Sequence, residues 1–167
     1  MDLLIVRHAI AYERNARRWR DDALRPLTPA GIRKFGKAAL GLRQLNIRPQ
    51  RVLSSPLVRA WQTAAVLAEV AEWPEAVECR QLEPGCSLSE LFVALRKLNV
   101  ESIAIVGHDP GLSRFIAAGI SRSAGGAAVR MKKGAVARLT FVRQVRPGGG
   151  RLEWLMTPRL LRLIGDA

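Results

Sequence analysis

The sequence predicts an α/β fold: a three-layer α/β/α sandwich around a mostly parallel sheet, with an antiparallel hairpin at one edge and no large helical insert. Short apolar runs rich in Val, Ile and Leu alternate with segments of about 10–18 residues that show helical periodicity. Parallel strands need such crossover helices, which cover both faces of the sheet. The last two predicted strands have no helix between them, so we expect them to pair as the hairpin.

The predicted strands are apolar runs bounded by turn signals. They lie at residues 2–6, 51–54, 103–107, 135–142 and 151–156, with a weaker one at 76–80. Pro147-Gly148-Gly149-Gly150 is expected to form the turn of the closing hairpin.

The predicted helices begin at proline, serine or threonine start signals. Thr28-Pro29, for example, combines an N-cap residue with proline at the first helical position. We expect helices over 29–45, over 56–71, from 87 or 89 to 98, and from 110 onward, where Leu112, Phe115 and Ile116 share one face.

Length and composition predict one domain, residues 1–167, with a single substantial core, since 49% of the residues are hydrophobic. No apolar run approaches the roughly 18–20 residues that cross a bilayer, and the N-terminus has no signal-peptide pattern. Cys79 and Cys86 form no CxxC motif, so we expect two reduced thiols. We therefore expect a cytoplasmic protein with no membrane partner.

The net charge of +13 is uneven along the chain. Residues 1–50 carry 11 Lys/Arg against 4 Asp/Glu, residues 51–111 carry 5 against 8, and residues 112–167 carry 11 against 2. A positive field attracts phosphorylated or acidic partners and binds nucleic acid non-specifically at low salt. We expect no specific nucleic-acid partner, because one Tyr and four Phe give no interleaved aromatic–basic pattern. Solvated basic faces are the alternative explanation of the charge.

Residues 9–27 join the first strand to the first helix by a segment that is long for an α/β connection. The segment holds five arginines and has little apolar periodicity. Loops of this length often form a wall of an active site, and a mobile surface loop is the alternative.

Two arginines and the only two histidines of the chain lie at strand ends or helix starts. Arg7 and His8 lie at the end of the first strand, and Arg59 lies in the first turn of the second helix. His108 follows the predicted strand at residues 103–107. The carboxyl ends of parallel strands meet at one edge of the sheet, where α/β proteins bind ligands. Each residue alone has an ordinary structural explanation, so the prediction of a shared pocket depends on their joint placement.

Two imidazoles and two guanidiniums suit phosphoryl transfer. A neutral imidazole is a nucleophile toward phosphorus, and attack gives a phosphohistidine intermediate. Arginines donate paired hydrogen bonds to the phosphoryl oxygens, so catalysis is mainly positioning and electrostatics. We expect no metal and no cofactor, and we expect phosphate, sulfate or vanadate to occupy the pocket.

Four segments resemble the histidine phosphatase superfamily, whose members have a phosphoglycerate mutase-like fold. Arg7-His8-Ala9 is similar to the Arg-His-Gly signature at the end of the first strand, with alanine in place of glycine. The other similar segments are Arg25–Gly31, Val52–Ala64 and Val106–His108. The resemblance covers the whole chain, and the small size without a large helical insert is similar to the SixA-type phosphohistidine phosphatases.

The resemblance implies roles for individual residues. His8 would be the phosphorylated nucleophile, and Arg7, Arg59 and His108 would form the phosphate pocket. Which carboxylate protonates the leaving group stays open.

Glu83 and Asp22 are the two candidates for that general acid, and a solvated surface carboxylate is the alternative for each. Arg25 would bind phosphate or orient Asp22.

The proton requirement of the leaving group favours a phosphohistidine substrate over a phosphomonoester. An alkoxide needs a proton to leave, whereas imidazole has a ring nitrogen that titrates near pH ~6.5. We therefore expect a metal-independent phosphatase that acts on phosphohistidine in signalling proteins. A general small-molecule phosphomonoesterase is the nearest alternative, and a non-catalytic phosphate- or nucleic-acid-binding module is a remote one.

Overall fold

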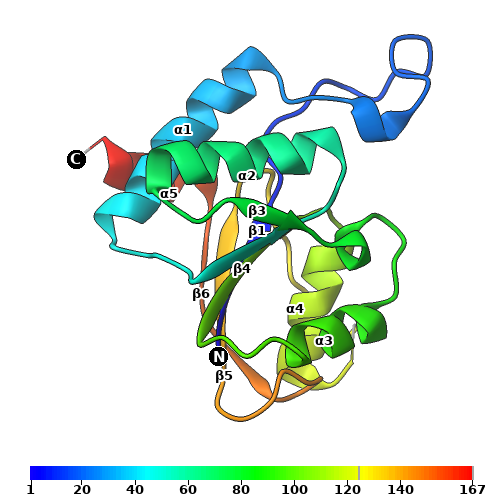
Figure 1. Cartoon of the computed structure of the whole chain (residues 1–167), viewed down its shortest axis with the longest axis vertical. Coiled ribbons are helices and arrows are strands. Elements are labelled where there is room, and N and C mark those ends of the chain that lie inside the picture. Colours follow the sequence, from blue (N-terminus) through cyan, green and yellow to red (C-terminus); the bar gives the residue numbers. More distant parts are fainter. Residues whose placement is uncertain (124, 167) are drawn as a thin grey trace.

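The computed structural model describes residues 1–123 and 125–166, and it shows an α/β fold around a six-stranded mixed sheet (Figure 1). The strand order is β3-β2-β4-β1-β5-β6; the first four strands run parallel, whereas β5 is antiparallel to both neighbours. The strands are β1 (Asp2–Arg7), β2 (Arg51–Ser54), β3 (Ala76–Glu78), β4 (Ser102–Gly107), β5 (Val136–Phe141) and β6 (Gly150–Met156). The predicted parallel sheet with an antiparallel edge hairpin is confirmed.

Helices cover both faces of this sheet, which confirms the three-layer prediction (Figure 1). One face carries α1, α2 and α5, and the other carries α3 and α4. Within the described residues the helices are α1 (Pro29–Gln44), α2 (Val58–Ala71), α3 (Leu88–Arg96), α4 (Gly111–Ser121) and α5 (Pro158–Gly165). In the same part of the chain, none of them combines the length and the hydrophobicity that a membrane span requires.

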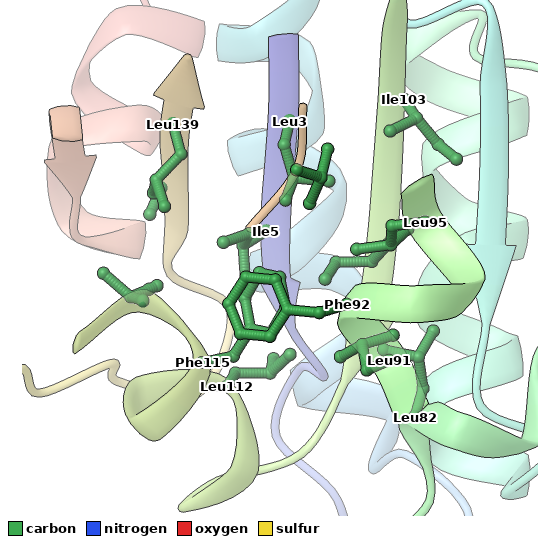
Figure 2. Close-up of a cluster of buried hydrophobic side chains, with 14 of the residues drawn as sticks. Leu3, Ile5, Leu82, Leu91, Phe92, Leu95, Ile103, Leu112, Phe115 and Leu139 are labelled. Atoms are coloured by element: carbon green, nitrogen blue, oxygen red, sulfur yellow. The ribbon is translucent and has the colours of Figure 1, made fainter. Parts of the chain in front are cut away.

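Alternating side chains of the central strands bury two separate cores. On β1, Leu3 and Ile5 pack under α3 and α4, whereas Leu4 and Val6 pack under α1 and α2. Figure 2 shows the first of these cores, in which the rings of Phe92 from α3 and Phe115 from α4 are stacked, with centroids 4.3 Å apart. Because both faces of β1 are buried, a one-residue slip would exchange the two cores, so its register is strongly specified.

The structure differs from the predicted elements mainly near the C-terminus. The helix α5 was not predicted, although Thr157 precedes Pro158 there as Thr28 precedes Pro29 in α1, and both threonine hydroxyls accept a backbone N–H of the first turn. The predicted third helix ends at Arg96 rather than 98. The hairpin connection spans 142–149 and is longer than the predicted glycine turn.

Helices α1 and α5 approach each other through glycines. A Cβ at Gly41 of α1 would lie 2.1 Å from the carbonyl oxygen of Leu161, and a Cβ at Gly165 of α5 would lie 2.2 Å from that of Lys37. These are backbone contacts, so neither can be relieved by rotating a side chain. The glycines therefore set how closely α5 docks on α1.

Replacing Gly41 by alanine is expected to lower the free energy of unfolding by about 1–3 kcal/mol, because the methyl group must push α5 away. Gly36→Ala on the same helix is the matched control, since a Cβ at Gly36 meets no atom within 4 Å. That control should stabilise the protein by about 0.5–1 kcal/mol. Urea unfolding measures both, and equal effects at the two positions would contradict the close-packing interpretation.

Candidate active site

The parallel pairing of β1 with β4 brings the two histidines together. Arg7 ends β1 in register with Gly107 at the end of β4, and the next residues are His8 and His108. The backbone N–H of His8 donates to the carbonyl of Gly107 (3.0 Å), and the two imidazole centroids are 5.1 Å apart. Both side chains are buried, with only 6% and 5% of their surface exposed. The structure thus brings the predicted pair into one place.

An open cleft of about 490 Å³ lies at this edge of the sheet. Six of the seven predicted site residues line it, together with residues of the long first loop. The lining residues are Arg7, His8, Tyr12, Glu13, Arg14, Asp22, Arg25, Arg59, Pro84, His108, Asp109 and Lys133.

His8 is held as a neutral imidazole with a defined tautomer. Its Nδ1 lies 2.7 Å from the carbonyl oxygen of Ala9, and because a carbonyl only accepts, Nδ1 carries the proton. The lone pair is therefore on Nε2. Burial lowers the pKa of His8 to about 3, helped by the nearby cations Arg59 and Arg7 and partly opposed by the bond to Ala9. At neutral pH this side chain is uncharged and nucleophilic at Nε2.

His108 is also neutral, and its Nε2 lies 2.9 Å from the hydroxyl oxygen of Ser55. That hydroxyl accepts the backbone N–H of Leu57 (3.3 Å) and has no acceptor other than His108 among the described residues, so we assign its hydrogen to the bond with His108. The proton of the ring is then on Nδ1, a buried atom with no hydrogen-bond partner among the described residues. Burial, followed by the neighbouring His8 and Arg59, lowers the pKa of His108 to about 3.

Arg59 reaches the cleft from the first turn of α2, and only 4% of its side chain is exposed. Its guanidinium donates to the backbone carbonyl of Asp22 (2.8 Å) and lies 3.2 Å from the Asp22 carboxylate. Burial lowers the pKa of Arg59, which nonetheless stays charged in the physiological range. This guanidinium is a fixed cation in the wall of the cleft.

Arg7 supplies the second cation of the cleft. It donates to the carbonyl of Met131 (2.5 Å) and lies 3.5 Å from the Asp109 carboxylate. Asp109 also accepts the hydroxyl of Ser113 in α4 (2.8 Å), so it links the end of β1 to that helix. The orientation of Arg7 is therefore fixed from two sides.

The carboxylate of Asp22 is held as an anion. Arg25 Nε donates to it (2.8 Å), and this bond, together with the charge of Arg59, keeps the pKa of Asp22 below its ordinary value. Arg25 also donates to the carbonyl of Tyr12 (2.7 Å). Arg25 thus orients Asp22 in this structure, and Asp22 is poorly suited to donate a proton.

Glu83, the other candidate acid, does not line this cleft. It lines a neighbouring hollow of about 130 Å³ that shares His108 and Asp109 with the main cleft. Pro84, the residue after Glu83, lines the main cleft, whereas Glu83 does not. The structure therefore places Glu83 beside the predicted pocket and not in it.

Ala9 fits the backbone that follows His8. Among the described residues other than glycine, only Asn46, Glu72 and Arg122 have a positive φ, so the conformation at Ala9 does not require glycine. Its N–H donates to the hydroxyl of Thr63 (3.0 Å), which in turn donates to the carbonyl of Arg59 (2.7 Å). The substitution of the signature glycine leaves the loop intact.

Three supporting residues were missed from the sequence: Ser55, Asp109 and Thr63. Ser55 follows β2 and Asp109 follows His108, so the strand-end rule that identified the histidines applies to both. The role of Thr63 depends on its burial in α2 against Ala9, for which the sequence carries no signal.

Within residues 1–123 and 125–166, no group of three or more His, Cys, Asp or Glu side chains is arranged to hold a metal ion. The cleft instead presents two neutral imidazoles and a set of guanidiniums. Such donors match a tetrahedral oxyanion such as phosphate.

The comparisons with known proteins agree on one family. The profile of the histidine phosphatase superfamily (branch 1) matches residues 3–83. An uncharacterized protein of Picosynechococcus sp. is 31% identical over 156 residues, which cover 92% of this chain and 89% of that protein. The phosphohistidine phosphatase SixA of Escherichia coli is 26% identical over 167 residues, 98% of each chain. A solved structure of the protein histidine phosphatase SixA complexed with tungstate superimposes with a TM-score of 0.82 at 27% identity, covering 96% of this chain and 99% of that one.

Lowering the pH is expected to destabilise the fold through the two buried histidines. Their folded-state pKa is about 3 against an ordinary value of 6.5, so between these pH values the unfolded chain binds more protons. The free energy of unfolding then falls as the pH falls from 6.5 toward 3, by about 1.4 kcal/mol per pH unit for each histidine.

Urea unfolding in chloride buffer at steps between pH 7 and pH 4 measures this slope. Comparison with His108→Asn cancels the contribution of the carboxylates, and this variant should lose one histidine's share of the slope. An identical slope in the wild type and the variant would refute the assignment.

Proposed function

Because the chain belongs to the histidine phosphatase superfamily, we propose that it is a phosphatase that forms a phosphohistidine at His8 and removes phosphate from phosphohistidine in signalling proteins. The observation that carries this proposal is the bond from His8 Nδ1–H to the carbonyl of Ala9. It leaves the lone pair of Nε2 free at a cleft lined by Arg7, Arg59 and His108.

In the first step, Nε2 of His8 attacks phosphorus, a P–N bond forms, and the bond to the leaving group breaks. Arg7 and Arg59 donate to the equatorial oxygens, which hold the phosphoryl charge. His108 lines the cleft beside His8, and its Nε2 is held by Ser55. The cation that forms on His8 is stabilised by the carbonyl of Ala9 at Nδ1.

In the second step, water attacks phosphorus and the P–N bond breaks. The bonding pair returns to His8 Nε2, and both protons of the water leave with the phosphate as dihydrogen phosphate. His8 is again the neutral tautomer that began the cycle. The same donors serve both steps, since charge on the phosphoryl oxygens is similar throughout.

A phosphohistidine substrate is consistent with the ionised state of the Asp22 carboxylate. When its distal ring nitrogen is protonated, phosphohistidine releases a neutral imidazole, so transfer to His8 needs no general acid. An alkoxide leaving group does need one, and Asp22 is held ionised by Arg25. The cleft is also open, which admits the surface of a protein.

His8→Ala is expected to reduce hydrolysis of a phosphohistidine peptide and of p-nitrophenyl phosphate by at least about 1,000-fold, since it removes the nucleophile. Rapid quenching of the wild type should trap a phosphoryl group that is labile in acid and stable in alkali, as phosphoramidates are. Mutation of the exposed Cys86 to alanine is the control and should leave turnover unchanged. Wild-type-like turnover in His8→Ala would disprove the proposal.

Asp22→Asn and Glu83→Gln are expected to retain kcat for a phosphohistidine peptide within about 10-fold, because no general acid is needed. With phenyl phosphate, whose leaving group needs a proton, loss of a true general acid costs about 100-fold or more. Steady-state kinetics on both substrates separate these outcomes. A 100-fold loss with the peptide in either variant would contradict the proposed chemistry, and a wild-type preference for phenyl phosphate would favour the small-molecule phosphomonoesterase.

A further inference from the structure

An arginine-rich segment lies beside the mouth of the cleft. Arg14, Arg17, Arg18 and Arg20, here called the arginine ridge, are exposed side chains of the loop that projects from the body of the molecule (Figure 1, blue segment at the upper right). Of these four, Arg14 lines the cleft. The other three do not line it.

The backbone of the arginine ridge is fixed by Asn15. Its side-chain oxygen accepts the backbone N–H of Arg17 (2.9 Å) and of Arg18 (3.1 Å), and its carbonyl accepts the N–H of Trp19 (2.8 Å). These bonds close a single helical turn. The arginine ridge therefore has a hydrogen-bonded backbone turn.

Arg18 connects the ridge to the wall of the cleft. Its guanidinium lies over the ring of Tyr12, 4.4 Å from the centroid, and 5.1 Å from that of Trp19. Tyr12 lines the cleft, and its carbonyl accepts a hydrogen bond from Arg25. Arg18 therefore packs on the outer side of a residue of the cleft wall, while its own side chain does not line the cleft.

The arginine ridge lacks the carboxylate partners that neutralise arginines in the cleft. Arg25 and Arg59 in the cleft pair with Asp22, whereas among the described residues no carboxylate lies within 4.0 Å of a nitrogen of the four ridge arginines. The nearby carboxylates in sequence are Glu13, which lines the cleft, and Asp21, which accepts the N–H of Ala23. The guanidiniums of the ridge remain free to bind anionic groups.

We propose that the arginine ridge binds acidic side chains flanking the phosphorylated residue of a protein substrate. The proposal rests on the proposed function and specifies its substrate: a phosphohistidine in an acidic polypeptide surface. An acidic protein fits better than nucleic acid, because Arg18 covers the rings of Tyr12 and Trp19 on which bases would stack.

Three synthetic phosphohistidine peptides test the proposal. They share one core sequence and carry four flanking Glu, Gln or Lys residues. The wild type at low salt should have a kcat/KM for the Glu peptide about 5-fold or more above that for the Gln peptide, since three exposed ion pairs of modest strength suffice for this ratio. The Lys peptide should be slowest, and the preference should weaken as salt is added.

The triple variant R17A/R18A/R20A should reduce the Glu/Gln ratio to about 1 while leaving kcat for p-nitrophenyl phosphate unchanged, because these residues lie outside the cleft. R51A/R143A/R151A is the matched control. It removes the same charge from exposed positions at the opposite end of the sheet and should keep the ratio.

Two results of the kinetics overturn the proposal. A wild-type ratio of kcat/KM for the Glu and Gln peptides near 1 shows that the enzyme does not distinguish flanking charge. An equal loss of this ratio in both triple variants shows that net charge alone is responsible. If no substrate is hydrolysed, the proposed function fails. Fluorescence anisotropy with the same peptides then tests the binding of acidic peptides by itself, and the Kd for the Gln peptide should exceed that for the Glu peptide by the same ratio. Preferential binding of a single-stranded DNA oligonucleotide through the ridge assigns the surface to nucleic acid instead.

Discussion

The parallel, in-register pairing of β1 with β4 is the constraint on which the site depends. It matches Arg7 to Gly107, so the residues that follow, His8 and His108, leave the sheet side by side. Both strands are buried on two faces, and each face packs a different core. A shift of register would therefore disrupt both cores and separate the histidines at once, which ties the geometry of the cleft to the hydrophobic core.

Burial then determines the chemistry of the two imidazoles. Removing them from water and surrounding them with cations keeps both neutral, and a hydrogen bond to each ring selects which nitrogen carries the proton. The cations themselves are held by partners from three segments of the chain: Asp22 for Arg59, and Met131 and Asp109 for Arg7. In the proposed mechanism the donors to a phosphate are in this way positioned before it binds, so little reorganisation opposes catalysis.

Much of this arrangement was predictable from the sequence, because it follows local rules. Alternating apolar strands and capped helices fixed the layers, and the rule that parallel strand ends converge placed Arg7, His8 and His108 together. What was missed depends on contacts between segments far apart in the chain. The short amphipathic α5 packs on α1 through glycine contacts, and no local pattern states that Gly41 and Gly165 face each other. The pairing of the buried Arg59 with Asp22, 37 residues away, is likewise a contact between distant segments.

The segment between β1 and α1 is closed at its neck. Ala11 pairs with Leu27 in an isolated bridge, and Tyr12 donates to the carbonyl of Pro26 (3.1 Å) while its own carbonyl accepts from Arg25. The two ends of the excursion are therefore fixed to each other independently of what lies between them. Lengthening such a loop costs little free energy, so the residues beyond the neck can change in sequence and length without disturbing the core. Within this loop Asp22 is tied to Arg59 of the cleft, so residues 15–20 are the part that can vary in sequence and length while the donors of the cleft stay in place.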